Sequence, residues 1–279
     1  MAADRRPYDR SVRLSPLLAS YDQLILDLDG CVYVGDEPTE RAPEAIAALR
    51  EAGKRIAFVT NNSRLRGEDY VQRLWKMEIQ ASLGEVVTVG GAVQHLLNET
   101  CHGQAAFVIG TAAMIEHVEA AGLRVHNGTD LASRAELVVV SGTEDFVFDD
   151  LRVAVQALRR GALFFATGRD PTYPMPDGLW PGAGALLSAV EYASDRVATI
   201  VGKPAPQLFL TALDRLGPSA RTLVVGDKLD SDIAAARAVG LDAALVLSGG
   251  TTAAEAAAAV DPRPDHVATT LAALVLGPA

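Results

Sequence analysis

Two aspartates that follow a short apolar run are the residues of this sequence best suited to chemistry. The three residues at positions 24–26 are all apolar and lead directly to Asp27 and Asp29. A run without polar interruption is typical of a strand that is buried on both faces of a parallel sheet. Alternate side chains of an extended chain point the same way, so we expect both carboxylates on one side. Two such charges repel each other unless a metal ion or a shared proton compensates them.

Polar residues also stand at the ends of three later apolar runs. They are Thr60 and Asn61 after residues 56–59, Lys203 after residues 198–201, and Asp227 with Asp232 after residues 222–225. Ligands of an open α/β sheet bind outside the carboxyl ends of its strands, so we expect these side chains to meet at one crevice. The acids there suit Mg²⁺. The chain has only four lysines against 21 arginines, and a lysine ammonium in this place suits a phosphoryl oxygen.

The order of the apolar runs predicts an α/β fold. Strands are expected over residues 23–27, 56–59, 105–109, 137–140, 163–166, 198–201, 222–225 and 243–247. Helices are expected over residues 43–50, 67–77, 93–98, 112–121, 150–160, 208–216 and 233–239. This alternation implies a doubly wound, Rossmann-like parallel sheet. A loop rich in proline and glycine is expected over residues 167–184, and loops of that length are usually functional or mobile.

The composition excludes several classes of partner. The formal net charge of −10 argues against a nucleic acid or an anionic membrane as the main partner. Two cysteines are too few for a disulfide framework, and the first 20 residues lack the apolar core of a signal peptide. No apolar run approaches the length of a membrane span. We therefore expect a cytoplasmic globular protein, in which Cys31 is a small packing residue.

Four segments resemble, in the same order, the four motifs of the haloacid-dehalogenase superfamily. They are Asp27-Leu28-Asp29-Gly30, Thr60-Asn61-Asn62, Gly202-Lys203-Pro204 and Gly226-Asp227-Lys228-Leu229-Asp230-Ser231-Asp232-Ile233. The similarity runs from about Asp22 to the C-terminus. It is greatest to the type-IIA cap branch, which contains p-nitrophenylphosphatases, phosphoglycolate and pyridoxal phosphatases and NagD-type nucleotidases. It implies a hydrolase core of residues 1–100 and 196–279, with an inserted α/β cap over residues 101–195.

The resemblance implies a Mg²⁺-dependent phosphomonoester hydrolase that acts on a small soluble phosphate. Asp27 would attack phosphorus and form an aspartyl-phosphate, which divides one difficult displacement into two easier ones. Asp29 would protonate the leaving oxygen and then take a proton from the water that hydrolyses the intermediate.

The resemblance also assigns the residues that would bind the metal and the phosphoryl group. The implied Mg²⁺ ligands are the Asp27 carboxylate, the Asp29 backbone carbonyl and Asp227. The implied phosphate-binding groups are Thr60, the Asn61 backbone N–H and Lys203. Asp232 would contact the groups around the metal and would not bind the metal itself. Asp230 is expected to cap the next helix.

Recognition of the leaving group is expected to fall to the cap. If the cap covers the crevice, residues 167–176 would reach toward it, so Tyr173, Arg169 and Asp170 are candidates for this recognition. Tyr173 would either contact the substrate or be an ordinary exposed loop tyrosine. The physiological substrate stays open, and so does a homodimer through the cap, which is common among relatives of this branch.

Two other functions fit the residues less well. A non-catalytic module that binds a phosphate or a nucleotide would have no need of a nucleophile such as Asp27. A dehalogenase needs no second acid, and a phosphonate hydrolase needs a lysine in its cap. Asp29 is present, and no lysine lies between Lys76 and Lys203, so both of these activities are disfavoured.

Overall fold

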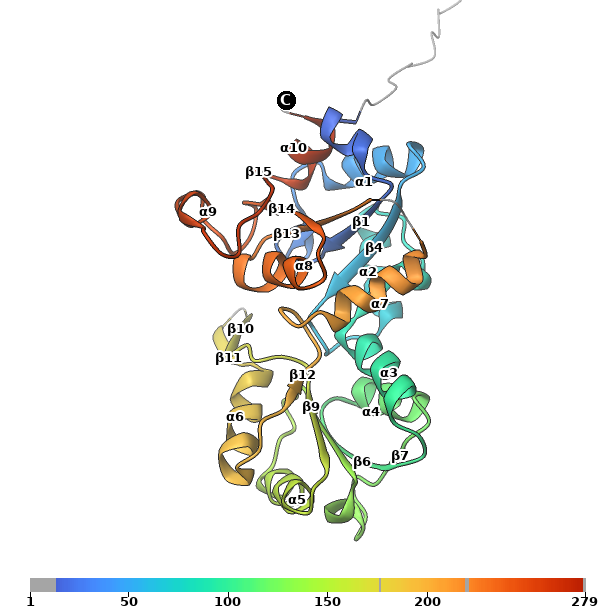
Figure 1. The fold of residues 1–279 in the computed structure, drawn as a ribbon, viewed down its shortest axis with the longest axis vertical. Coiled ribbons are helices and arrows are strands. Elements are labelled where there is room, and N and C mark those ends of the chain that lie inside the picture. The colour runs from blue at the N-terminus through green and yellow to red at the C-terminus, as the bar shows by residue number, and fades with distance from the viewer. Residues whose placement is uncertain (1–13, 176, 219–220, 278–279) are drawn as a thin grey trace, which may run out of the picture.

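The computed structural model describes residues 14–175, 177–218 and 221–277, and its larger sheet has six parallel strands (Figure 1). The strands are β1 Gln23–Asp27, β4 Arg55–Thr60, β5 Val86–Thr88, β13 Thr222–Gly226, β14 Asp242–Val246 and β15 His266–Ala268. Their order in the sheet is β15-β14-β13-β1-β4-β5. The chain therefore builds outward from β1 in one direction and later from β13 in the other. Such a switch point is where open α/β sheets bind ligands.

Alternate residues of β1 face two different hydrophobic cores. The helices of this layer are α1 Ala42–Glu51, α2 Gly67–Lys76, α3 Val89–Thr100, α7 Gln207–Leu216, α8 Ala234–Ala238, α9 Ala253–Ala258 and α10 Leu271–Leu276. Leu24 and Leu26 pack with residues of α1, α2 and α10 in one core. Ile25 packs with residues of α3, α7 and α8 in the other. Both faces of the strand are covered, which explains why its sequence is apolar without interruption.

A second parallel sheet is inserted in the chain between α3 and α7. Its strands, in the order β12-β9-β8-β6-β7, are β6 Ala105–Ile109, β7 Arg124–Val125, β8 Leu137–Val140, β9 Leu163–Ala166 and β12 Thr199–Ile200. Its helices are α4 Ala112–Ala120, α5 Phe148–Arg159 and α6 Ala183–Ser194. We call this inserted layer, β6 to β12, the cap. The predicted fold class, a doubly wound core with an inserted α/β cap, is confirmed.

Two antiparallel hairpins complete the described structure. β2 Tyr33–Val34 pairs with β3 Glu37–Pro38 directly after β1. β10 Thr172–Met175 pairs with β11 Gly178–Pro181 inside the segment that was expected to be a loop. The rings of Tyr173 and Trp180, partners across β10 and β11, lie 6.4 Å apart and help to hold the strands together. This hairpin lies where the cap meets the larger layer, below α8 in Figure 1.

Two expected elements are corrected. The strand at residues 198–201 does not rejoin the larger sheet, because β12 pairs with β9 of the cap. Ala198 and Ile200 pack into the apolar core of the cap, and this packing determines which sheet the short strand joins. The helix expected over residues 233–239 starts earlier, as the π-helical turn η4 Leu229–Ile233, and continues as α8 to Ala238.

Buried cysteines fit the expected absence of a disulfide framework. Cys31 and Cys101 are both free, and Cys31 lies in the core that contains Leu26, as expected of a packing residue. Among the helices within the described ranges, we find none with the length and apolar character to cross a bilayer.

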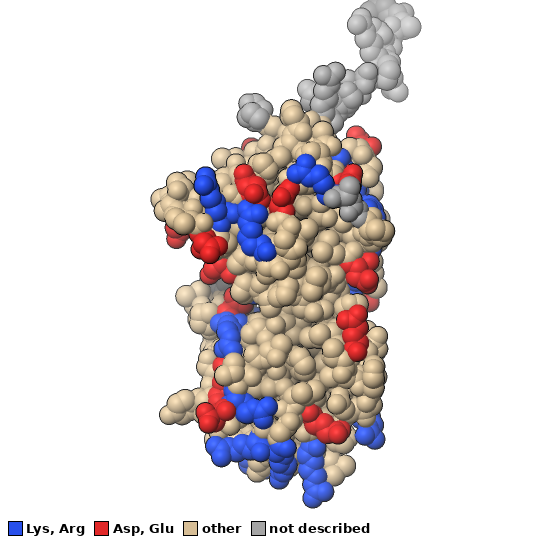
Figure 2. Space-filling model, in the orientation of Figure 1, with Lys and Arg blue, Asp and Glu red and all other residues tan. Residues whose placement is uncertain are grey.

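Charged side chains of both signs lie toward the upper end and the sides of the visible face, and basic ones gather at the far end of the cap (Figure 2). Arginines of the cap bond to backbone carbonyls near the end of α5. Arg196 donates to the Leu158 carbonyl at 2.9 Å, and Arg160 donates to the Gln156 carbonyl at 3.3 Å. Because carbonyls at a helix C-terminus carry partial negative charge, these contacts give the arginines a structural role.

Ile25 provides a test of the two-sided burial of β1. Ile25→Ala should lower the free energy of unfolding by about 2–5 kcal/mol, because it leaves a cavity in a packed core. Chemical denaturation measures this change. The control Val260→Ala, at a residue that is 86% exposed, should change it by less than about 0.5 kcal/mol. Equal effects of the two substitutions would contradict the described burial.

Candidate active site

Three adjacent strands of the larger sheet end in polar residues. Asp27 is the last residue of β1, Thr60 is the last residue of β4, and Asp227 directly follows β13. β1 is hydrogen-bonded to both other strands in parallel register, so the three carboxyl ends lie side by side. The strand-end residues that the sequence pointed to are thus brought to one edge of the sheet.

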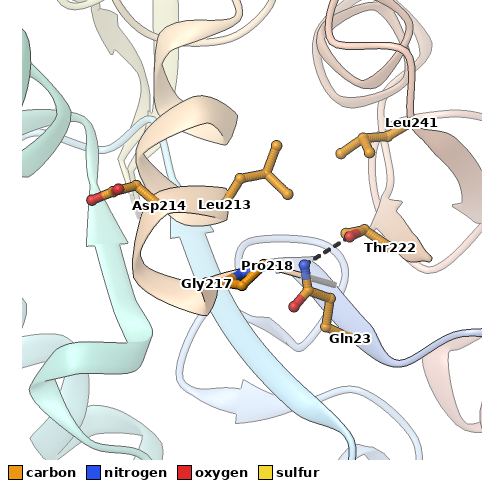
Figure 3. Close-up of a pocket in the computed structure, with 7 residues that line it drawn as sticks. All are labelled: Gln23, Leu213, Asp214, Gly217, Pro218, Thr222 and Leu241. Atoms are coloured by element: carbon orange, nitrogen blue, oxygen red, sulfur yellow. Dashed lines mark hydrogen bonds between the residues drawn. The ribbon is translucent and has the colours of Figure 1, made fainter. Parts of the chain in front are cut away.

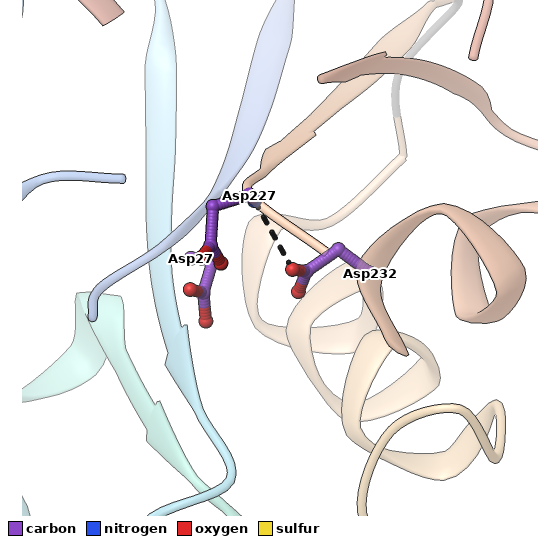
Figure 4. Close-up of side chains that lie close together, drawn as sticks. All are labelled: Asp27, Asp227 and Asp232. Atoms are coloured by element: carbon purple, nitrogen blue, oxygen red, sulfur yellow. Dashed lines mark hydrogen bonds between the residues drawn. The ribbon is translucent and has the colours of Figure 1, made fainter. Parts of the chain in front are cut away.

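Asp27, Asp227 and Asp232 form a cluster of buried carboxylates at this edge (Figure 4). One oxygen from each residue lies within 4.8 Å of those from the other two. The ammonium of Lys203 also lies in this cluster, and the residue is only 6% exposed. Its Nζ donates to Asp232 Oδ1 at 2.6 Å and also to Asp27 Oδ1. We call these four residues the acid cluster.

The acid cluster contains three carboxyl groups and one amine. Burial and the charge of Asp232 raise the pKa of Asp27 well above its ordinary value, and burial also raises the pKa of Asp227. Burial disfavours the charged form of Lys203, but the carboxylates of Asp232 and Asp27 outweigh it and raise the pKa of the ammonium. Ionisation of all three carboxylates against one ammonium would leave two uncompensated negative charges. A divalent cation would neutralise them.

The hydrogen bonds of the acid cluster determine which oxygens a metal ion can reach. Asp232 uses both of its oxygens, Oδ1 for Lys203 and Oδ2 for two backbone N–H groups at 3.2 and 3.1 Å. Asp227 Oδ2 accepts from the Gly250 N–H at 2.5 Å. The second oxygen of Asp227 and that of Asp27 are bound by no donor among the residues that the structure describes. These two oxygens fit a hard cation such as Mg²⁺, whereas Asp232 is occupied in holding Lys203 and the backbone.

The acid expected to cap the helix after β13 does not do so. η4 begins after Lys228, and no side chain caps it. Asp230 is exposed, while the Oδ2 of Asp232 accepts the N–H groups of Asp227 and Lys228. A carboxylate two residues further along thus satisfies the backbone donors of this turn. That role also fixes the orientation of Asp232 toward Lys203.

Glycines allow the backbone to pack closely around Asp227. Gly30 has a left-handed φ of +86°, and a Cβ there would collide with the Asp227 carboxylate. A Cβ at Gly249 would collide with the same group, and the next residue, Gly250, donates its N–H to it. Sequence reasoning missed the loop 248–250. The loop follows the apolar strand β14 at this same edge, so the signal that revealed the other residues was available here too.

Asn61 fixes the backbone of Lys203 from the neighbouring loop. Its Oδ1 accepts from the Lys203 N–H at 2.8 Å, and its Nδ2 donates to the Lys203 carbonyl at 2.9 Å. Thr60 is buried, and its Oγ1 accepts from the Asn62 N–H at 3.0 Å. The two bonds of Asn61 tie the loop after β4 to the loop after β12. The Thr60 hydroxyl and the Lys203 ammonium are therefore held at the same site.

Asp29 lies at the edge of the site and is not a member of the acid cluster. β1 ends at Asp27, and the following turn leaves Asp29 exposed and bridged to Tyr33. Simple strand alternation had led us to expect the carboxylates of Asp27 and Asp29 on the same side of the chain. That expectation was wrong, because the strand ends before Asp29. Although Asp29 keeps contact with solvent, desolvation by the surrounding protein raises its pKa above the ordinary value, against the opposing charge of Arg73. A raised pKa suits a group that must first hold a proton and then release it.

The three cap residues predicted to recognise a leaving group lie in different surroundings. Tyr173 contacts the layer of the larger sheet, because the guanidinium carbon of Arg64 lies 4.5 Å from the centroid of the Tyr173 ring. Arg169 forms a two-point ion pair with Glu191 inside the cap, at 2.8 and 2.7 Å. Asp170 is exposed, and its backbone carbonyl accepts a hydrogen bond from the start of α6 at 2.9 Å. Tyr173 is thus the candidate whose side chain contacts the loop after β4.

The opposite, amino-terminal edge of the larger sheet carries different groups. A hollow of about 430 Å³ lies there, lined by Gln23, Leu213, Asp214, Gly217, Pro218, Thr222 and Leu241 (Figure 3). Gln23 Nε2 donates to Thr222 Oγ1 at 2.8 Å. This lining contains one acid and no basic residue, so it lacks the grouped charges of the carboxyl edge.

Comparisons with known proteins agree with this geometry. The profile of the haloacid dehalogenase-like hydrolases matches residues 24–124, and a HAD-hydrolase-like profile matches residues 200–274. D-glycerol 3-phosphate phosphatase of Mycobacterium tuberculosis is 36% identical over 245 residues, which cover 87% of this chain and 67% of that protein. Chronophin of Homo sapiens is 35% identical over 263 residues, 89% of this chain and 88% of chronophin.

Similarity extends to solved structures. The glycerol phosphate phosphatase of Mycobacterium tuberculosis in complex with magnesium has a TM-score of 0.87 at 34% identity, over 94% of this chain and 79% of that one. Family profiles, sequence relatives and fold all point the same way. The chain belongs to the haloacid dehalogenase-like hydrolase family.

Proposed function

We propose that this hydrolase is a Mg²⁺-dependent phosphomonoesterase that passes the phosphoryl group of a small soluble phosphate first to Asp27 and then to water. The observation that carries the proposal is the acid cluster, in which Lys203 holds one oxygen of Asp27 and the other is available for reaction. A module that only bound phosphate would not need a buried carboxylate there, because it would repel the ligand. The phosphatase relative and its magnesium complex support the reaction class and the metal.

Two displacements at phosphorus make up the proposed reaction. In the first, the available oxygen of Asp27 forms a bond to phosphorus while the bond to the leaving oxygen breaks, and Asp29 donates a proton to that oxygen. In the second, Asp29 takes a proton from a water molecule whose oxygen attacks phosphorus. The bond between phosphorus and Asp27 then breaks, inorganic phosphate leaves, and both aspartates return to their starting states.

Positive groups are needed because both the nucleophile and the substrate are anionic. Thr60, the Asn61 backbone N–H and Lys203 would bind the phosphoryl oxygens, where the transition state carries its charge. Lys203 has three N–H donors and uses two of them within the acid cluster, so one is left for the substrate. Asp232 keeps the ammonium in place.

The metal would be held by groups of the same edge. We assign as its ligands the Asp27 carboxylate, the available carboxylate oxygen of Asp227 and the backbone carbonyl of Asp29. When bound, Mg²⁺ supplies the positive charge that lets an anionic carboxylate approach an anionic phosphate ester. The Gly30 and Gly250 backbones hold the Asp227 carboxylate in position for this role.

The organisation of the chain supports a division of labour. We propose that residues 1–100 and the chain after β12 carry the chemistry, and that the insertion from about residue 101 covers the substrate. Two free, buried cysteines support a cytoplasmic location. A homodimer through the cap belongs to the proposal as well, and the exposed apolar side chains of Phe148 and Tyr192 on the cap support it.

Asp27→Asn tests the nucleophile. An amide cannot attack phosphorus, so phosphate release from p-nitrophenyl phosphate with Mg²⁺ should fall by on the order of 10⁴-fold or more. Circular dichroism should show an unchanged fold. The control Asp230→Asn, at the exposed acid of the same motif, should keep its rate within about twofold. Wild-type turnover by Asp27→Asn would refute the assignment.

Gly30→Ala tests whether close packing of the backbone against the Asp227 carboxylate serves metal binding. Gly35→Ala is the matched control. Both glycines have positive φ, but a Cβ at Gly30 would strike the Asp227 carboxylate, whereas a Cβ at Gly35 would meet nothing within 4 Å. Each substitution should cost about 1–2 kcal/mol of stability from backbone strain. Titration with Mg²⁺, followed by thermal unfolding, should show metal affinity about 10–100-fold weaker in Gly30→Ala and close to wild type in Gly35→Ala. Equal Mg²⁺ affinities would show that this packing does not serve the metal.

A further inference from the structure

Three side chains join the core to the cap beside the proposed site, and we call Arg64, Glu144 and Tyr173 the cap–core cluster. The Arg64 guanidinium forms an ion pair with Glu144, and its carbon lies 4.5 Å from the centroid of the Tyr173 ring. The Tyr173 hydroxyl donates to Glu144 Oε1 at 3.4 Å. Each member therefore contacts the other two. One comes from the loop after β4, one from the loop after β8 and one from β10.

The cap–core cluster lies within reach of a substrate whose phosphoryl group is bound at the acid cluster. Arg64 is four residues beyond Thr60, and four extended residues span at most about 14 Å. The Arg64 N–H donates to Asn62 Oδ1 at 3.0 Å, so the loop folds back on itself. The same loop touches the cap through Ser63 Oγ and Ser141 Oγ, which are buried and 2.9 Å apart. The loop 60–64 therefore runs from Thr60, at the proposed phosphoryl site, to the cap, and a leaving group directed along this loop would meet the cap–core cluster.

The charge and the ring face in this cluster are already paired. Glu144 neutralises the guanidinium of Arg64, and the guanidinium covers a face of the Tyr173 ring. A leaving group with a carboxylate would be repelled at the guanidinium by the like charge of Glu144. A planar aromatic leaving group would have to displace Arg64 to stack on the same face of the ring. Repulsion in the first case and the loss of an existing contact in the second both weaken the net gain on binding.

The cap–core cluster still has hydrogen-bond donors and acceptors that its own contacts do not use. A guanidinium carries five N–H donors and a carboxylate about four acceptor positions, more than the contacts within the cluster use. The side chains of Arg64 and Glu144 are 30% and 48% exposed, so these groups are accessible. An alcohol hydroxyl can donate to Glu144 and accept from Arg64 without breaking their ion pair.

We infer that the cap–core cluster selects phosphate esters of neutral, hydroxyl-rich alcohols over esters whose leaving group bears a carboxylate or a planar aromatic ring. The inference rests on the proposed function, because it concerns the leaving group of that reaction. Arg64, Glu144 and Tyr173 are specificity-determining residues in this account, and they take no part in the transfer of the phosphoryl group.

Rates of phosphate release with Mg²⁺ test the inference on three esters: glycerol 3-phosphate, phosphoglycolate and pyridoxal 5′-phosphate. Wild-type protein should have its highest kcat/KM for glycerol 3-phosphate. Glu144→Gln keeps the size of the side chain but leaves the charge of Arg64 unpaired. The ratio of kcat/KM for phosphoglycolate to that for glycerol 3-phosphate should then rise at least about fivefold.

Glu191→Gln is the matched control, because it removes the same charge from the Arg169–Glu191 pair within the cap. Its ratio should equal that of the wild type. An unchanged ratio in Glu144→Gln, or a wild type that prefers phosphoglycolate or pyridoxal 5′-phosphate, would overturn the inference. p-Nitrophenyl phosphate separates the two proposals, since its good leaving group needs little recognition. If p-nitrophenyl phosphate is hydrolysed, either contradicting result overturns the inference alone. If no ester is hydrolysed, the proposed function fails together with the inference.

Discussion

The buried ammonium of Lys203, held between Asp27 and Asp232, is the interaction on which the rest of the site depends. Each of these charges would be costly to bury alone, and removing one partner of a buried pair typically costs about 3–5 kcal/mol. Backbone groups hold the pair rigidly: Asn61 binds both the N–H and the carbonyl of Lys203, and two N–H groups bind Asp232. The segments after β1, β4, β12 and β13 are thereby fixed to one another before any substrate arrives. Groups that are placed in advance need no reorganisation during reaction, which is the main source of electrostatic catalysis.

The fold separates two tasks that a phosphoester hydrolase has to perform. In the proposed reaction, the charged groups at the carboxyl edge of the larger sheet act on phosphorus, and these groups are the same for every ester. The cap presents the surface that a leaving group would meet. One loop, residues 60–64, belongs to both, because it begins at Thr60 beside the acid cluster and ends at Arg64 against Tyr173 and Glu144. In this account, a change in the cap alters the choice of alcohol without disturbing the chemistry.

The proposed site residues of the core could be located from the sequence because they follow a simple rule. Asp27, Thr60 and Asp227 each stand where an apolar strand ends, and parallel strands bring their carboxyl ends together. The two-layer fold was predictable for the same reason, since uninterrupted apolar runs identify strands covered on both faces.

Features that depend on long-range packing could not be read in this way. The two-residue strand β12 has too little pattern to show which sheet it joins, and its apolar neighbours place it in the cap. The pairing of Arg64 with Glu144 joins residues far apart in the chain, and nothing in either local sequence marks it. The position of Asp29 also departed from simple alternation, because β1 ends two residues earlier.

In the proposed reaction, the phosphoryl group passes through the side chain of Asp27. Acid quenching during steady-state turnover of a ³²P-labelled phosphate ester, followed by digestion and peptide mapping, tests this most directly. We expect label on the peptide that contains Asp27, in a linkage that hydroxylamine cleaves as it does an acyl phosphate. Label on a different residue, or none on the protein while labelled phosphate is being released, would contradict it.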